Sequence, residues 1–246
     1  MRLRFLTTIL SIALFSHGLW AAEEDPFAKA NQAFADARYE EAAAGYQELV
    51  RSGHWNANLF YNLGNAHYRL GNFGQAILNY ERALALEPRH PEADANLRLA
   101  RDEARALELR KDPVERYAGF ATVKQWSIAA AIALWVALFL AAQMLLAPKR
   151  AAGRIALIAL GFVISAASVF AIRTLENGTS GMALAVVTGH NVAARIATAD
   201  SAQAVLALPA GSEIKVLNER GDWLYAELPN DKHGWIPRSA AERVRM

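Results

Sequence analysis

Cysteine is absent from this 246-residue chain. Without a thiol the chain can form no disulfide, no thiol nucleophile and no zinc–thiolate site, and it cannot carry the lipid-modified cysteine of a bacterial lipoprotein. Other signatures are missing too, since there is no HExxH, P-loop, dinucleotide-binding or Gly-x-Ser-x-Gly motif, and the six histidines lack metal-ligand spacing. We therefore expect no catalytic residue, no cofactor and no metal, and predict that the protein is not an enzyme.

A strong charge of one sign is missing as well, because 26 Lys and Arg stand against 24 Asp and Glu. Five of the basic residues flank apolar segments: Arg2, Arg4, Lys149, Arg150 and Arg154. Without these five, 21 basic residues face 24 acidic ones. The small basic excess therefore belongs to membrane-topology signals, and we expect no nucleic-acid partner.

Charged residues are absent from residues 126–147 and from residues 155–172. Each segment approaches the ~18–20 apolar residues that cross a bilayer core. We predict two transmembrane helices, residues 126–147 and 155–173, which make the lipid bilayer one partner of the chain. The basic connector, residues 148–154, is expected in the cytoplasm by the positive-inside rule.

Residues 1–22 are typical of a secretory signal peptide, with a basic start, an apolar stretch and a small-residue end. The alternative is an uncleaved anchor helix. A cleaved signal followed by a helical hairpin places the parts on both sides of the hairpin outside the cytoplasm, in agreement with the basic connector.

A pattern of aromatic, small and asparagine residues recurs 34 residues later in the first third of the chain. The first copy comprises Phe27, Ala30, Asn31, Phe34, Tyr39, Ala42 and Tyr46, and the second comprises Tyr61, Gly64, Asn65, Tyr68, Phe73, Ala76 and Tyr80. This period predicts stacked helix–turn–helix pairs. Such arrays serve as binding surfaces more often than as active sites.

Residues 57–90 resemble a tetratricopeptide (TPR) repeat at almost every signature position. Gly64 allows close approach of the second helix, Ala76 is the small residue facing it, and Pro88 ends the second helix. His67 departs from the family, which usually has Tyr there. The first copy is the weaker match. A charged third helix from Pro91 is expected to cap the array with one solvated face. We assign residues 23–112 to the repeats and cap, and residues 113–125 to a juxtamembrane linker.

The resemblance implies that the first helix of each pair lines a concave groove. The expected groove residues are Phe27, Asn31, Phe34, Tyr61, Asn62, Asn65, Tyr68, Arg69 and Asn96. Asn31 and Asn65 would hold a peptide backbone or carboxylate, because an amide both donates and accepts hydrogen bonds. The alternative is that these asparagines tie helices together and the aromatic residues only pack.

Residues 181–246 change character, with short apolar runs between turn residues, which predicts a small barrel of short strands. The segments at 208–212, 221–225 and 233–237 resemble a bacterial SH3-like domain. Such domains often bind peptidoglycan, although residues 191–195 depart from the usual motif. The candidate ligand surface is Trp223, Tyr225 and Trp235, and the alternative for the two tryptophans is a place in the core.

The fold class expected is thus multidomain: all-α TPR repeats, a two-helix transmembrane hairpin and a small all-β SH3-like barrel. This order resembles BatE-type proteins of the Bacteroides aerotolerance (Bat) system. The resemblance implies membrane partners with von Willebrand A domains and other Bat-type components, in envelope stress or aerotolerance.

The first hypothesis is a multi-pass scaffold of the bacterial cytoplasmic (inner) membrane, with the TPR and SH3-like modules on the extracytoplasmic (periplasmic) side. Holding two modules together raises their effective concentration for a shared partner. The alternative is a peptidoglycan-binding envelope protein. A sensor ranks last, since the inner loop of about seven residues leaves little to receive a signal.

Overall fold

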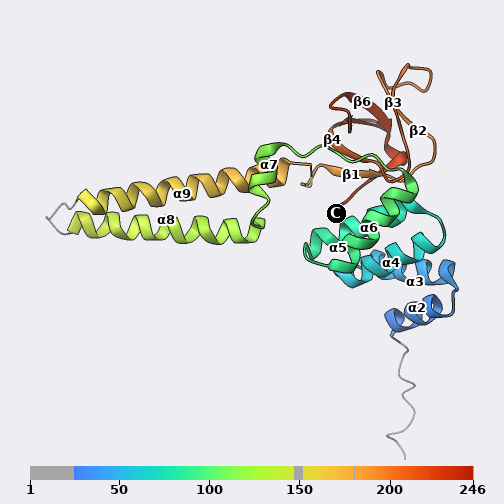
Figure 1. The fold of residues 1–246 in the computed structure, drawn as a ribbon, viewed down its shortest axis with the longest axis horizontal. Coiled ribbons are helices and arrows are strands. Elements are labelled where there is room, and N and C mark those ends of the chain that lie inside the picture. Colours follow the sequence, from blue (N-terminus) through green and yellow to red (C-terminus); the bar gives the residue numbers. More distant parts are fainter. Residues whose placement is uncertain (1–24, 147–151, 180, 246) are drawn as a thin grey trace, which may run out of the picture. The chain divides into compact units, whose positions relative to one another are not determined.

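The computed structural model describes residues 25–146, 152–179 and 181–245. The chain divides into two compact units, Met1–Trp55 and Asn56–Met246 (Figure 1). The expected signal peptide, residues 1–22, lies outside the described residues, as does most of the expected cytoplasmic loop.

The first unit is a helical hairpin made of α2 (Pro26–Ala35) and α3 (Tyr39–Arg51). Asp25 begins α2 by accepting a hydrogen bond from the backbone N–H of Phe27, and Pro26 occupies the first helical position, where no N–H is needed. Gly45 allows close packing, because a Cβ there would lie 3.0 Å from the Cβ of Ala30.

The second unit begins with α4 (Ala57–Arg69), α5 (Phe73–Leu86) and α6 (Pro91–Ala104). Asn56 caps α4 through its side chain, 2.8 Å from the backbone nitrogen of Leu59. A Cβ on Gly64 would meet the Tyr80 ring at 2.7 Å, so α4 and α5 approach as closely as the sequence predicts.

A short helix and a long hairpin follow: α7 (Pro113–Ala118), α8 (Val123–Leu146) and α9 (Ala152–Asn177). Within the described residues, α8 and α9 are long and apolar enough to cross a membrane, judged by length and composition. Only 6% and 17% of their most apolar windows are buried. A core helix of a soluble protein would be buried on its apolar sides, whereas Trp135 of α8 is 72% exposed.

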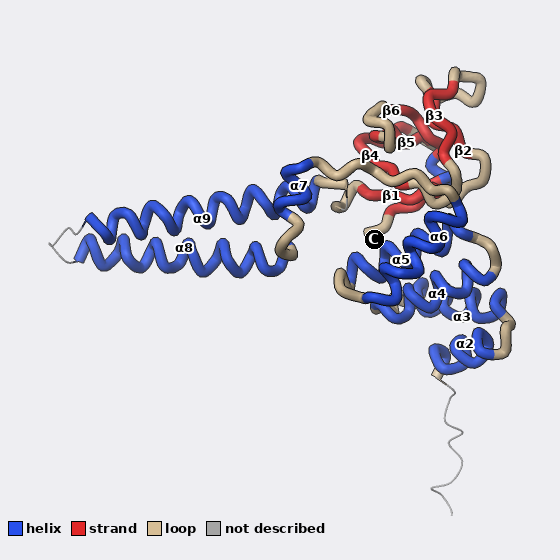
Figure 2. The backbone as a smooth tube through the Cα atoms, viewed as in Figure 1, coloured by secondary structure: helices blue, strands red, loops and turns tan. Residues whose placement is uncertain are grey.

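Small residues bring α8 and α9 together along the hairpin (Figure 2). A Cβ on Gly161 would lie 2.9 Å from both the carbonyl oxygen of Ala133 and the Cβ of Ala137. Ala137 is fully buried although α8 as a whole is exposed. Ala133 and Ala137 are four residues apart on one side of α8, and small residues at this spacing favour close helix packing in lipid.

The C-terminal region forms an antiparallel sheet in the order β3-β2-β6-β5-β4-β1-β7 (Figure 2). Its elements are β1 (Leu184–Val187), β2 (Val192–Arg195), β3 (Ala204–Leu208), β4 (Glu213–Arg220), β5 (Trp223–Glu227), β6 (His233–Pro237), η1 (Arg238–Ala240) and β7 (Ala241–Arg243). The sheet is open, with β3 and β7 as its two edges, so the closed barrel expected from the sequence is not confirmed. The strand spacing predicted short strands and turns but carried no information on closure.

The sheet and the second repeat share one hydrophobic core. Leu184 and Val186 of β1 pack in the same cluster as Ile77 of α5 and Leu97 of α6. A second cluster, built around Ile214 and neighbouring strands, fills the interior of the sheet region itself. Helix α5 therefore buries its outer side against β1, which compensates for an array too short to bury a continuous core alone.

Candidate partner-binding site

One face of α4 carries the expected groove residues of the second unit, and α6 contributes to it. The Oδ1 atom of Asn65 accepts hydrogen bonds from the Tyr80 hydroxyl at 2.8 Å and from Nδ2 of Asn96 at 2.9 Å. Nδ2 of Asn96 also donates to the Tyr61 hydroxyl at 3.5 Å. Asn65 thus connects three helices, and the structure brings it together with Tyr61 and Asn96.

The first unit repeats this arrangement at the 34-residue offset. The Tyr46 hydroxyl donates to Oδ1 of Asn31 at 2.7 Å. Phe27 packs on Tyr46 with ring centroids 5.9 Å apart, as Tyr61 packs on Tyr80 at 6.2 Å.

The second aromatic pair also recurs. Phe34 and Tyr39 form an edge contact at 5.3 Å, and their counterparts Tyr68 and Phe73 form one at 5.6 Å. The two helix pairs therefore share their internal packing as well as their sequence pattern.

These hydrogen bonds agree with the alternative in which the two asparagines tie helices together. Burial raises the pKa of the Tyr80 hydroxyl, which keeps it protonated as the donor to Asn65. The groove residues are half-buried, apart from exposed Arg69. Asn62 and Arg69 lie on the same helix as Tyr61 and Tyr68, so α4 offers an amide, a guanidinium and two phenol rings to a partner.

A groove of about 450 Å³ lies on the first unit, away from the expected site residues. Its lining includes the small residues Ala30, Ala33 and Gly45 and the charged residues Lys29 and Glu41. The expected residues of α2 (Phe27, Asn31 and Phe34) do not line it.

The three aromatic residues proposed for the sheet alternate with core residues along β5 and β6. Trp223 and Tyr225 are half-buried on one face of β5, while Leu224 between them is buried on the other. Trp235 lies directly opposite Tyr225 on β6, with ring centroids 5.0 Å apart. The structure therefore brings these side chains to one face of the sheet, outside its core.

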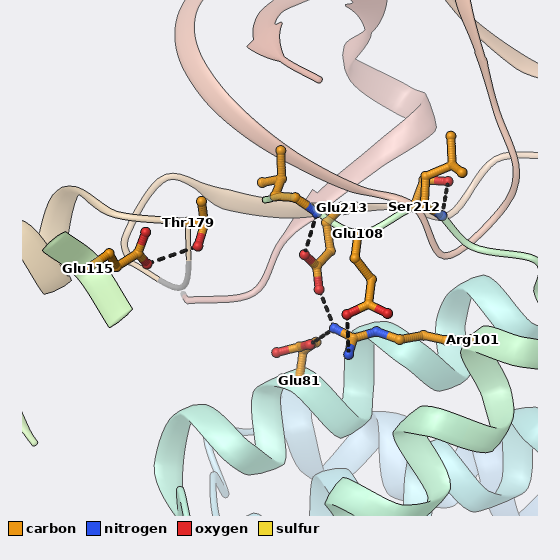
Figure 3. A network of polar contacts seen from close by, with 9 residues as sticks. Glu81, Arg101, Glu108, Glu115, Thr179, Ser212 and Glu213 are labelled. Carbon is orange, nitrogen blue, oxygen red and sulfur yellow. Dashed lines mark hydrogen bonds and ion pairs between the residues drawn. The ribbon is translucent and has the colours of Figure 1, made fainter. Parts of the chain in front are cut away.

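A buried ionic network joins the helices to the sheet (Figure 3). The guanidinium of Arg101 on α6 binds Glu81 of α5 at 2.6 Å and also binds Glu213 of β4. Glu108 lies in the segment after α6, and its Oε2 is 3.2 Å from Nη1 of the same guanidinium. The other oxygen of Glu213 accepts from the backbone N–H of Leu109 at 3.0 Å.

The network places two buried carboxylates on one cation. The side chains of Arg101, Glu81 and Glu213 are only 14%, 14% and 10% exposed. Burial raises the pKa of Glu81 to about 7, against the opposing effect of Arg101. Burial likewise raises the pKa of Glu213. The network is therefore able to take up a proton near neutral pH.

A second set of polar contacts links α5 to β7. Arg82 donates to Glu242 at 3.3 Å and to the backbone carbonyl of Arg243 at 3.1 Å. Nε2 of Gln75 donates to the other oxygen of Glu242 at 2.8 Å. Burial lowers the pKa of His67, the residue that departs from the TPR pattern, although the Glu242 charge opposes this.

Sequence reasoning missed these contacts. The charged helix from Pro91 was expected to present one solvated face, yet the Arg101 side chain is only 14% exposed. A glycine was one available signal, because a Cβ on Gly74 in the first turn of α5 would lie 3.1 Å from the backbone oxygen of Val187. A helical glycine with no internal role indicates close approach of another segment.

Comparison with known families supports the helical assignment. The family model described as "Tetratricopeptide repeat" matches residues 57–90, the segment that forms α4 and α5. A comparison with curated proteins gives no match. A TPR repeat suggests a protein–protein interaction role in general.

Proposed function

We propose that this chain is a non-enzymatic scaffold, anchored in the bacterial cytoplasmic membrane by α8 and α9, which binds a protein partner through the TPR face. The observation that carries the proposal is a TPR repeat in the same chain as two apolar helices that bury few of their large side chains. The finer assignment is to a Bat-type envelope complex, with partners that contain von Willebrand A domains. The sheet would act as an SH3-like module beside the repeats on the extracytoplasmic side.

The partner-binding face is proposed to be the side of α4 that carries Tyr61, Asn62, Tyr68 and Arg69. Two observations favour this face within the second unit. The outer side of α5 is covered by β1 and β7, and α6 is joined to β4 by Arg101. These contacts make the outer side of α5 unavailable to a partner, which favours the α4 side for binding.

A capture experiment tests the proposed face. The variant Asn62→Ala/Arg69→Ala removes a half-buried amide and an exposed guanidinium from the proposed face, and thermal unfolding verifies that the variant folds. The control Asn218→Ala/Arg220→Ala removes the same residue types from an exposed stretch of β4. After crosslinking in native membranes, the protein captured by the natural chain should be lost with the first variant and kept with the control. Equal capture by both variants would exclude this face.

The proposed orientation needs a separate test, because both ends of the hairpin are basic. Arg116, Lys124 and Arg173 lie near the end opposite the loop at 148–154. The chain has no cysteine, so Ser239→Cys supplies a unique thiol on the exposed η1 turn. A membrane-impermeant maleimide should label it in cells whose outer barrier has been opened. Labelling only after lysis of the inner membrane would place both modules in the cytoplasm.

A second candidate function is peptidoglycan binding by the sheet. The observation that favours it is the Tyr225–Trp235 ring pair on the face opposite the sheet core, since aromatic faces suit sugar rings and peptide stems. The full-length protein in detergent should then sediment with purified sacculi. Tyr225→Ala should reduce sedimentation and Tyr225→Phe should preserve it, whereas a protein-binding scaffold stays in the supernatant in every case.

A further inference from the structure

Helix α7 is fixed to both membrane-directed helices by specific contacts. The Thr179 hydroxyl, just after α9, donates to Oε1 of Glu115 at 2.8 Å, and Glu115 is buried (Figure 3). On the other side, Nε1 of Trp126 in α8 donates to the carbonyl oxygen of Ala118 at 2.9 Å. These bonds hold α7 where α8 begins and α9 ends, which is one face of the proposed membrane.

The two sides of α7 differ in burial. Glu115 and Ala118 are buried, at 6% and 7% exposure. Val114 is 47% exposed, and Tyr117 and Phe120 are each 78% exposed. Val114 and Tyr117 on α7, together with Phe120 two residues beyond its end, are called the α7 face.

The α7 face is continuous with the apolar surface of the hairpin. The Phe120 ring makes an edge contact with the Trp126 ring at a centroid distance of 4.9 Å, and Trp126 lies in the first turn of α8. Tyr and Trp rings are enriched where a membrane meets water, because one end of each ring is apolar and the other polar. Arg116 on α7, Lys124 near the start of α8 and Arg173 near the end of α9 are exposed. Their charge complements anionic lipid headgroups.

We propose that the α7 face lies in the headgroup region of an anionic bilayer, with Tyr117 and Phe120 inserted beside Trp126. The α7 face is covered by the lipid bilayer itself. The contacts that bury Glu115 and Ala118 turn this face outward, next to the start of α8 and the end of α9. The short helix then fixes the depth of the hairpin. This inference rests on the proposed membrane anchoring.

Nitroxide labels test the position directly, because the chain offers a cysteine-free background. Single-cysteine variants Tyr117→Cys, Phe120→Cys, Leu99→Cys and Trp135→Cys are labelled and reconstituted in vesicles of phosphatidylglycerol and phosphatidylcholine. Collision rates with oxygen and with a water-soluble nickel chelate are then measured. Leu99 is the matched control, since it is an apolar side chain 55% exposed on α6.

We expect labels at 117 and 120 to collide less with nickel and more with oxygen than the label at 99. The label at 135, in the middle of α8, reports on the anchoring itself. If position 135 is shielded from nickel while 117 and 120 match 99, the interfacial position of α7 is wrong and the anchoring stands. If 135 is also open to nickel, the proposed membrane anchoring fails. The same labels in phosphatidylcholine alone should show weaker shielding at 117 and 120.

Discussion

The buried Arg101 network predicts an unusual dependence of stability on pH. Glu81 and Glu213 share one guanidinium, with Glu108 and Lys111 as the other charged groups acting on Glu81. Burial raises the pKa of Glu81 from 4.5 to about 7. The folded state therefore binds a proton that the unfolded state releases between these pH values. The stability contributed by protonated Glu81 is full below pH 4.5 and is lost as pH rises through about 7.

The variant Glu81→Gln isolates this contribution, because glutamine has nearly the same shape and stays neutral. At pH 5 the variant and the natural chain should have nearly equal stability. At pH 8 the natural chain should be less stable than the variant by on the order of 3 kcal/mol, since each pKa unit corresponds to 1.36 kcal/mol. For a folded unit of this size, that is a difference of about 6–12 °C in Tm.

The assay is thermal unfolding of the full-length protein in detergent, at pH 5, 6, 7 and 8. Glu108→Gln is the matched control: it contacts the same guanidinium, yet its side chain is 58% exposed, and an exposed ion pair contributes only ~0–1 kcal/mol. Glu213→Gln is measured alongside, since the two buried carboxylates share the proton. The reasoning is refuted if neither buried variant gains stability over the natural chain between pH 5 and pH 8.

Two further predictions concern close packing at glycine. Gly64→Ala should cost about 1–3 kcal/mol, because the new Cβ would overlap the Tyr80 ring, whereas Gly153→Ala, with open space around it, should not lower Tm in the same unfolding assay. Gly161→Leu should push α8 and α9 apart, which would lengthen the distance between spin labels at the exposed positions 132 and 163; a distance equal to that of Gly153→Leu would contradict the packing.

Local patterns in the sequence predicted the elements but not the contacts between distant ones. The TPR helices were predictable because Gly64, Ala76 and Tyr80 recur at positions set by the internal packing of each pair. The Arg101–Glu213 ion pair was not, because 112 residues separate its members and each alone looks like a solvated surface charge. The hydrogen bond between Thr179 and Glu115 was not predictable for the same reason, because 64 residues separate them. The expected barrel is not confirmed, because the sheet is open. The sequence could not predict this, since strand spacing carries no information on pairing order or closure.

In the candidate site too, the sequence predicted the repeated residues but not the contacts that they make. Asn31 and Asn65 stood out because they recur, and the structure explains the recurrence by the Tyr46 and Tyr80 hydroxyls that bind them. A recurring polar residue in a repeat marks shared internal packing, while recognition of one partner needs residues that differ between copies. Asn62 and Arg69 fit that second description, since neither belongs to the repeated pattern.

Hydrogen bonds at short intervals hold the segment between the repeats and the α8–α9 hairpin, which bears on how the proposed scaffold would act. The backbone N–H of Leu107 donates to the Ser212 hydroxyl at 3.1 Å, and the N–H of Glu213 donates to the carbonyl of Leu107 at 2.9 Å. Further along, Glu115 accepts a hydrogen bond from the Thr179 hydroxyl. Nε1 of Trp126 donates to the carbonyl oxygen of Ala118. A linker held in this way has little conformational freedom left to lose when a partner binds. The sequence assigned residues 113–125 to a linker, but Glu115 and Ala118 tie this segment to the end of α9 and the start of α8, while Leu107 and Leu109 tie the preceding segment to the sheet. Under the proposed function, the sheet would contribute to partner binding by supporting α5 and α6.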